Sequence, residues 1–184
     1  MSRFELRRHD GQAAALMTEQ LADAYMEGYA DDPDVGHSIY ARDAFVDRTS
    51  RQAAAPGFVL ITAHSGDQWA GFSFGMHFPA GRWWAGDWED VPPQDLLKAE
   101  KFAVIELVVL PAARGVGLAT ELMSAVLADR PEPWATLLAD QEGKARSMYD
   151  RWGWKRTGVI QPAPDVPPLD VLVRSIGGAD TGNR

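Results

Sequence analysis

The sequence predicts a mixed α/β fold, in which helices pack against one sheet of mixed strands. Some segments repeat apolar residues at helical spacing, and others are short runs of β-branched and aromatic residues. In order, these segments are a strand, helices, a hairpin, a strand with a glycine loop and helix, and then a strand, a helix and strands. The 184 residues suit one domain, which we expect to span residues 1–176, with a disordered tail over 177–184.

The first third of the chain predicts an edge strand and two helices. The edge strand covers residues 4–8. Residues 12–29 place Ala, Leu and Met on one face of a helix, which the acidic segment over 31–34 ends. Residues 38–54 predict a second helix that buries Phe45, and a Pro-Gly pair then breaks the chain.

The middle of the chain predicts a hairpin and an inserted loop. Residues 58–63 and 68–77 are strand-like, and the turn 64–67 between them contains glycine and aspartate. Residues 78–95 mix Gly, Pro, Trp and acidic residues without periodicity, so we expect a loop there.

The last half alternates strands and helices. The most regular strand, residues 102–109, is nearly all apolar. The other expected elements are a helical turn over 96–100, helices over 118–129 and 144–151, and strands over 134–139, 157–160 and 169–173.

Composition narrows the function classes. A net charge of −8 argues against general nucleic-acid binding and suits an amine or cationic substrate. There is no cysteine, which excludes disulfides and thiol catalysis, and the four histidines show no metal-ligand spacing, so we expect no metal. The sequence shows no secretory signal and no apolar run of about 20 residues, so we expect a cytoplasmic protein without a membrane partner.

The segment from Glu106 to Thr120 carries the clearest functional signal. An apolar strand runs into a turn, a loop with Gly115 and Gly117, and then a helix. Such a loop directs free backbone N–H groups and the positive helix end at one spot, which favours a phosphate or pyrophosphate. Neither glycine has a Cβ to block close approach.

Two common phosphate-binding motifs fit this loop poorly. A Walker A loop needs a lysine followed by Ser or Thr after its glycines, and none is present. A Rossmann fingerprint would match Gly115 and Gly117, but the chain opens with helices and a hairpin and not with strand–helix–strand units.

The segment Arg114-Gly115-Val116-Gly117-Leu118-Ala119 resembles the acetyl-CoA signature of the GNAT (Gcn5-related N-acetyltransferase) superfamily. Downstream, Ala145, Tyr149, Gly153 and Trp154 resemble the second signature of the family, with Glu142 where Asn is usual. The resemblance implies the GNAT-like acyl-CoA N-acyltransferase fold. It also implies that the loop amides hold the coenzyme A pyrophosphate and that the preceding strand pairs with the pantetheine arm. The implied coenzyme-binding residues are Leu107, Val108, Val109, Arg114, Gly115, Val116, Gly117, Leu118, Ala119, Thr120 and Glu142.

The implied function is an acetyl-CoA-dependent N-acetyltransferase that moves an acetyl group directly to an amine. By resemblance, Tyr149 is the general acid for the departing thiolate, and the amide of Val109 stabilises the oxyanion. Glu106 is the candidate base, because it is a lone charge in an apolar strand and several GNAT enzymes carry an acid there. A solvated or salt-bridged Glu106 and a packing role for Tyr149 are the alternatives.

The acceptor side is less defined. Aromatic faces beside carboxylates favour a protonated amine, so Trp83, Trp84 and Tyr29 are candidate substrate-binding residues. Alternatively, the tryptophans anchor their loop to the core. We expect a small-molecule or peptide amine as the acceptor, with a homodimer possible as in related enzymes. The alternative function is a non-catalytic acyl-CoA-binding or sensor module. The feature that supports it is Glu142 at the position where Asn is usual.

Overall fold

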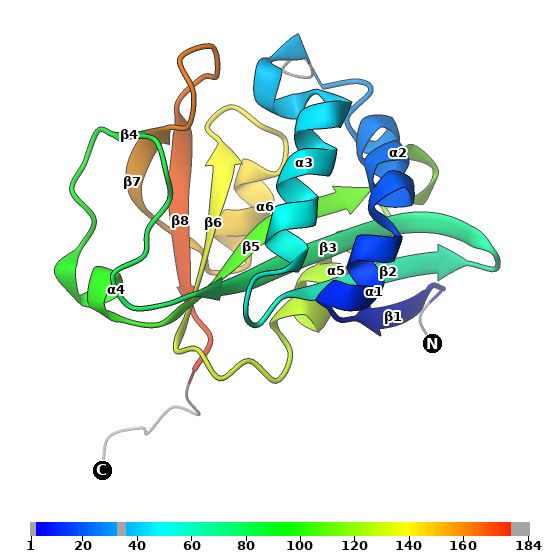
Figure 1. The fold of residues 1–184 in the computed structure, drawn as a ribbon, viewed down its shortest axis with the longest axis horizontal. Helices are drawn as coiled ribbons and strands as arrows, with labels where there is room; N and C mark the ends of the chain where they lie inside the picture. The colour runs from blue at the N-terminus through cyan, green and yellow to red at the C-terminus, as the bar shows by residue number, and fades with distance from the viewer. Residues whose placement is uncertain (1–2, 33–35, 178–184) are drawn as a thin grey trace. The chain divides into compact units, whose positions relative to one another are not determined.

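The structure is a computed structural model that describes residues 3–32 and 36–177 (Figure 1). Among these residues, hydrogen bonding orders eight strands as β1-β2-β3-β5-β6-β8-β7-β4, with parallel and antiparallel pairs. The predicted mixed α/β class is therefore confirmed. Of the expected tail, residues 178–184 lie outside the described residues.

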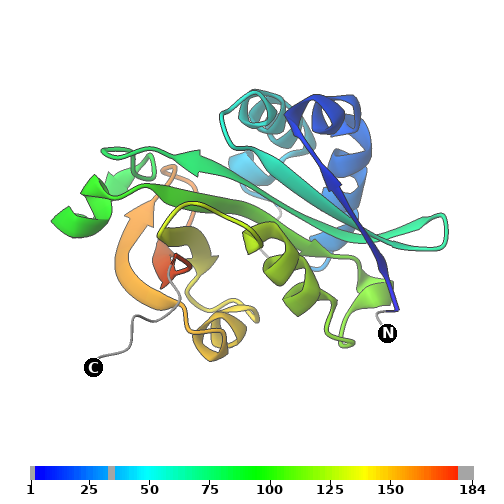
Figure 2. The same ribbon diagram turned by 90° about the horizontal axis from the view of Figure 1, so that it is seen from below.

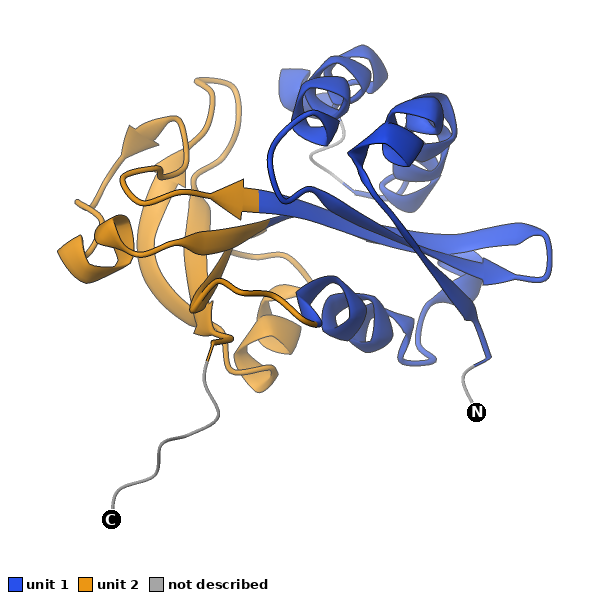
Figure 3. Ribbon diagram, turned by 60° about the horizontal axis from the view of Figure 1, so that its bottom comes forward, with its two compact units in different colours: residues 1–76, 104–128 blue, residues 77–103, 129–184 orange. Residues whose placement is uncertain are grey.

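The chain divides into two compact units, residues 1–76 with 104–128 and residues 77–103 with 129–184 (Figure 3). The strands β3 (Gln68–Phe78) and β5 (Lys101–Val109) each contribute residues to both units. The expected single domain over residues 1–176 stays a prediction.

The first unit is an antiparallel sheet with helices on both faces. Strand β2 (Val59–Ser65) pairs antiparallel with β1 (Glu5–His9) and with β3. Figure 2 shows α1 to α3 on one face of these strands and α5 on the other. The remaining elements of this unit are α1 (Gly11–Leu16), α2 (Thr18–Gly28), the 3-10 turn η2 (Ser38–Tyr40), α3 (Arg42–Ala53), the 3-10 turn η3 (Pro111–Ala113) and α5 (Leu118–Leu127).

Both predicted N-terminal helices are interrupted. The helix expected over 12–29 breaks at Met17, whose φ of −107° and ψ of 8° end α1 and begin α2. The helix expected over 38–54 breaks at Ala41, whose extended backbone (φ −61°, ψ 144°) separates η2 from α3. Neither break involves Gly or Pro, so helix propensity gave no indication of either break.

Aromatic rings fill the core of the first unit. Tyr25 stacks on Phe45 with ring centroids 4.2 Å apart. The edge of Phe45 then meets Phe72 and Phe74 of β3 at 6.4 and 6.5 Å. Because α2, α3 and β3 each supply one side of this cluster, burying it fixes both helices to the sheet.

The second unit is built on a mostly antiparallel sheet. Strand β8 (Leu169–Ser175) pairs antiparallel with β6 (Trp134–Asp140) and β7 (Lys155–Gln161), while β5 pairs parallel with β6 over Lys101–Ala103. The unit also contains α4 (Gln94–Lys98) and α6 (Arg146–Arg151).

The expected loop over 78–95 contains more order than its composition suggested. Residues Asp87–Trp88 form the short strand β4, which pairs with Gln161 and Ile160 of β7. The first residues of α4 also fall within this range. A two-residue strand is too short to show alternation in a sequence.

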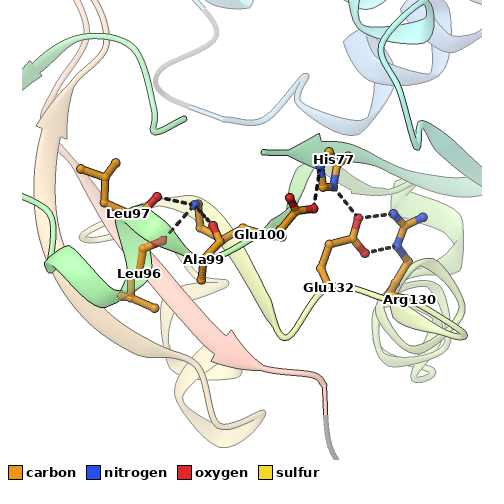
Figure 4. A network of polar contacts seen from close by, with 8 residues as sticks. His77, Leu96, Leu97, Ala99, Glu100, Arg130 and Glu132 are labelled. Carbon is orange, nitrogen blue, oxygen red and sulfur yellow. Dashed lines mark hydrogen bonds and ion pairs between the residues drawn. The ribbon is translucent and has the colours of Figure 1, made fainter. Parts of the chain in front are cut away.

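A buried lysine organises the turn between α4 and β5. Lys101 is fully buried, and its ammonium donates to the carbonyls of Leu96 (2.9 Å), Ala99 (2.6 Å) and Leu97 (3.5 Å) (Figure 4). Burial lowers the pKa of Lys101. The three carbonyls offset the desolvation of the charge, and the charge in turn closes the end of a helix of only five residues.

A second network lies beside it. The ring of His77 meets Glu132 at 2.9 Å through Nδ1 and Glu100 at 3.1 Å through Nε2, and Arg130 pairs with Glu132 at 2.6 Å (Figure 4). Glu132 is only 2% exposed. Burial alone would raise its pKa, but the hydrogen bonds from Arg130 and His77 outweigh burial and lower it.

We expect Lys101→Met to destabilise the fold by about 2–4 kcal/mol, because it leaves buried carbonyls without their donor. The measurement is the free energy of unfolding in urea. Lys98→Met is the matched control, since Lys98 is an exposed lysine three residues earlier, at the end of α4, and should change stability by less than about 0.5 kcal/mol. Equal losses for the two variants would contradict this role of Lys101.

Candidate functional site

The predicted phosphate loop forms in the first unit. Gly115 has φ 77°, and Gly117, the N-cap residue of α5, has φ 90°. The amides of Thr120 and Glu121 both donate to the Gly117 carbonyl, at 3.0 and 3.3 Å. This leaves the earlier first-turn amides of the helix without an intrahelical acceptor, as an anion site requires.

Arg114 ties this loop to the rest of the first unit. Its Nε donates to the Val109 carbonyl at 3.2 Å, and its Nη2 donates to the Gly28 carbonyl at the end of α2. The guanidinium therefore fixes the loop between β5 and α2, and the backbone of the loop is left to meet a ligand. Val116, at the tip, is 49% exposed.

The end of β5 lies against β3. The side chain of Val108 is buried, and a Cβ on Gly71 of β3 would fall 2.5 Å from the Val108 carbonyl. Gly71 thus permits the two backbones to approach closely. The parallel pairing of β5 with β6 covers only Lys101–Ala103, so Leu107, Val108 and Val109 lie outside it.

Glu106 lies among polar side chains of the first unit. Its side chain is 10% exposed, and Arg48 of α3 approaches Oε1 with Nη2 at 3.4 Å. Tyr29 also hydrogen-bonds to this carboxylate, and the charge of Glu106 acts on Tyr25. A second nitrogen of Arg48 donates to the Ile39 carbonyl at 2.7 Å, which holds the guanidinium in place.

This environment sets the proton affinity of Glu106. Burial raises its pKa to about 7, while Arg48 and Tyr29 oppose the rise. Burial, with the nearby Glu106 charge, raises the pKa of Tyr25. A carboxyl group poised near neutrality can accept a proton in its charged form and is suited to general base catalysis.

The residues of the second signature form a local motif in the second unit. Tyr149 is a buried residue of α6, and its ring meets the edges of Trp152 at 5.9 Å and Trp154 at 6.3 Å. Gly153 ends the helix at φ 81°, and the amide of Trp154 then donates to the Tyr149 carbonyl at 3.1 Å. The spacing of Tyr149, Gly153 and Trp154 therefore also has a structural reason, because these residues together end α6.

Glu142 begins the turn before α6. Its backbone amide donates to the Asp140 carboxylate at 3.0 Å, and its own side chain is exposed. The carboxylate is thus free to point toward solvent.

The tryptophans of the inserted loop have structural partners in the second unit. The indole N–H of Trp84 donates to Thr136 Oγ1 at 3.0 Å, and its ring meets Phe78 at 5.1 Å. Lys101 lies 5.7 Å from the ring of Trp83. Trp88, the third tryptophan of this loop, is 46% exposed and donates to the Trp84 carbonyl. These contacts suit the anchoring interpretation, and substrate binding by Trp83 and Trp84 stays a prediction.

Sequence reasoning missed Arg48. It lies 58 residues before Glu106 on another element, and no local pattern relates the two. Tyr29, predicted only as an acceptor contact, proves to be a hydrogen-bond partner of Glu106.

Between residues 3 and 177, leaving out 33–35, no three His, Asp or Glu side chains are grouped so as to bind a metal ion. In the same part of the chain, no helix has the length and apolar character to span a bilayer.

Comparison with known proteins finds one matching family model and many similar folds. Residues 97–164 match the family model described as an acetyltransferase (GNAT) domain. No curated protein matches the sequence.

Solved acetyltransferase structures share the fold at low identity. A histone acetyltransferase HPA2 and related acetyltransferase from Corynebacterium glutamicum aligns over 98% of this chain and 100% of its own, at 19% identity and a TM-score of 0.65. Aminoglycoside 6'-acetyltransferase type Ii aligns over 95% and 99%, at 16% identity and a TM-score of 0.62. The PaiA N-acetyltransferase from Thermoplasma acidophilum, solved with coenzyme A, aligns over 95% and 99%, at 12% identity and a TM-score of 0.56.

These likenesses confirm the fold that the two motifs implied. The strand, loop and helix of the phosphate site, with the Tyr149 helix after them, all lie inside the matched segment. The chain therefore shares the GNAT acetyltransferase fold, and its residues 97–164 match the domain model of that family.

Proposed function

We propose that this protein is an acetyl-CoA-dependent N-acetyltransferase that moves the acetyl group directly to an amine. The observation that carries the proposal is the loop after β5, where two glycines with positive φ precede the free amides at the start of α5. This loop fits a diphosphate, because it offers N–H donors and no carboxylate within the loop itself. The residues proposed to hold the coenzyme are those from Arg114 to Thr120, with Leu107, Val108 and Val109 along the strand and Glu142 after β6.

The coenzyme supplies the activated acetyl group as a thioester. Around it, this chain must remove a proton from the amine, stabilise an oxyanion and protonate a thiolate. Glu106 takes the amine proton as the C–N bond forms, because its pKa of about 7 lets it bind that proton near neutral pH. The Val109 amide donates to the oxyanion, and Tyr149 donates its phenolic hydrogen toward sulfur as the C–S bond breaks.

The acceptor is proposed to be a small-molecule or peptide amine. The net charge of −8 favours a cation over an anion. Tyr29 is the best supported acceptor contact, since its hydroxyl meets the carboxylate that would receive the amine proton. Two of the structural neighbours bear the names of a histone and an aminoglycoside acetyltransferase, so amines of both sizes belong in the test.

Thiol release from acetyl-CoA tests the proposal directly. The panel is spermidine, kanamycin, phenethylamine and a lysine-containing peptide. We expect at least one amine to stimulate release well above hydrolysis without an acceptor. Coenzyme A binding without stimulated release by any amine would instead favour the acyl-CoA sensor, which the carboxylate of Glu142 at the usual Asn position keeps as the second candidate.

We expect Tyr149→Phe to lower turnover about 10- to 100-fold, because the departing thiolate loses its proton donor. Affinity for coenzyme A should stay within about twofold, since the ring is retained. Steady-state rates with the most active amine and calorimetric titration with coenzyme A measure the two quantities. An unchanged rate would exclude the acid role of Tyr149.

A further inference from the structure

One buried carboxylate in the second unit accepts hydrogen bonds from three separate segments. Asp170 of β8 is 5% exposed. Arg156 Nε reaches its Oδ1 at 2.8 Å, Gln141 Nε2 reaches the same oxygen at 3.2 Å, and Arg146 Nε reaches Oδ2 at 2.9 Å. Burial alone would raise the pKa of Asp170, but the bonds from Arg156 and Arg146 outweigh it and lower the pKa.

The two arginines are not equivalent. Arg146 is the first residue of α6 and its side chain is 19% exposed, whereas Arg156 lies in β7 and is 51% exposed. The bond to Arg146 is therefore less screened by water, and of the two it is the one that reaches the start of α6. Arg146 also pairs with Asp150 one turn along the same helix, at 2.5 Å.

Helix α6 needs such an anchor. It has six residues, and Ala145 at its N-cap supplies no capping side chain. A helix this short is not stable by itself and takes its position from tertiary contacts. At its start that contact is Arg146 with Asp170, whereas at its end the rings of Trp152 and Trp154 pack locally around Tyr149.

We propose that Asp170 is a positioning residue that acts through Arg146 to fix α6 and the direction of the Tyr149 hydroxyl. The inference rests on the proposed acid role of Tyr149. A displacement of about 1 Å at a reacting group can lower a rate about 100-fold, so an anchor at the start of this helix affects turnover while leaving coenzyme binding intact.

The arginines provide a matched test, because each can be removed from the same carboxylate. We expect Arg146→Met to lower turnover about 10- to 100-fold with the coenzyme A dissociation constant unchanged within about twofold. Arg156→Met should keep turnover within about threefold of the parent. Asp170→Asn should behave like Arg146→Met, Arg146→Lys should recover part of the rate, and Asp150→Asn controls for the exposed pair within the helix. Circular dichroism confirms that each variant is folded.

A double-mutant cycle then separates positioning from a general loss of structure. If Arg146 acts through Tyr149, Arg146→Met combined with Tyr149→Phe should be no slower than the slower single variant. Multiplied losses, or equal losses from Arg146→Met and Arg156→Met, would overturn the positioning role while leaving the acid role of Tyr149 intact. An unchanged Tyr149→Phe rate would overturn the acid role, and the positioning role with it.

Discussion

Replacing Gly117 by glutamate is expected to weaken coenzyme A binding at least about 100-fold. The φ of 90° at this position is costly for any L-residue with a Cβ, by about 1–2 kcal/mol. The new carboxylate would also stand at the start of α5, where the diphosphate is proposed to bind, and the two negative charges would compete for the same amides. Calorimetric titration with coenzyme A measures the loss.

Gly66 provides the matched control. It lies in the turn between β2 and β3 with φ 61°, and at both glycines a Cβ would meet no atom within 4 Å. Gly66→Glu should therefore lower stability to a similar degree, yet bind coenzyme A like the parent. Unchanged affinity in the Gly117 variant, or equal losses in both, would count against the loop as the diphosphate site.

The second large effect is expected for Glu106→Gln, which should lower kcat/KM about 100- to 10,000-fold. In the parent enzyme, the rate should rise with pH to a plateau above an apparent pKa of about 7, because only the ionised carboxylate accepts the amine proton. The variant should lose this limb of the profile. The test is the rate of the parent and of the variant between pH 5.5 and 9. If the rate of the variant still rises with pH, a group other than Glu106 is responsible for that rise.

The same carboxyl group links stability to pH. Its pKa in the folded protein, about 7, exceeds the ordinary value of 4.5, so folding favours the protonated form. Its contribution to stability is full below pH 4.5 and is lost as pH rises to about 7, by an amount on the order of 3 kcal/mol. Glu106→Gln should thus be more stable than the parent at pH 8, in contrast to Glu27→Gln at an exposed position of α2. Equal stability of the Glu106 variant and the parent at pH 8 would contradict the buried state of Glu106.

The elements with a strong local signal were predictable from sequence. Strand β5 is apolar apart from Lys101 and Glu106, and Gly117 marks the start of α5, so both the strand and the loop appeared where expected. The breaks at Met17 and Ala41 were not predictable, because packing against the sheet decides them and neither residue is a helix breaker.

The residues of the candidate site also differ in how far the sequence predicts them. The loop glycines and Glu106 stand out in the sequence, one set as a motif and the other as a charge in an apolar run. Arg48 and Asp170 do not, because each meets its partners only after distant segments have folded together. The sequence thus indicates which residues carry chemistry, whereas the residues that tune or hold them come from tertiary structure.

We propose that backbone amides of the loop from Gly115 to Ala119 bind the diphosphate of acetyl-CoA. A crystal structure of the protein with acetyl-CoA tests this proposal. We predict diphosphate oxygens within hydrogen-bond distance of these amides. Density for the diphosphate elsewhere, or loop amides turned away from it, would contradict the account.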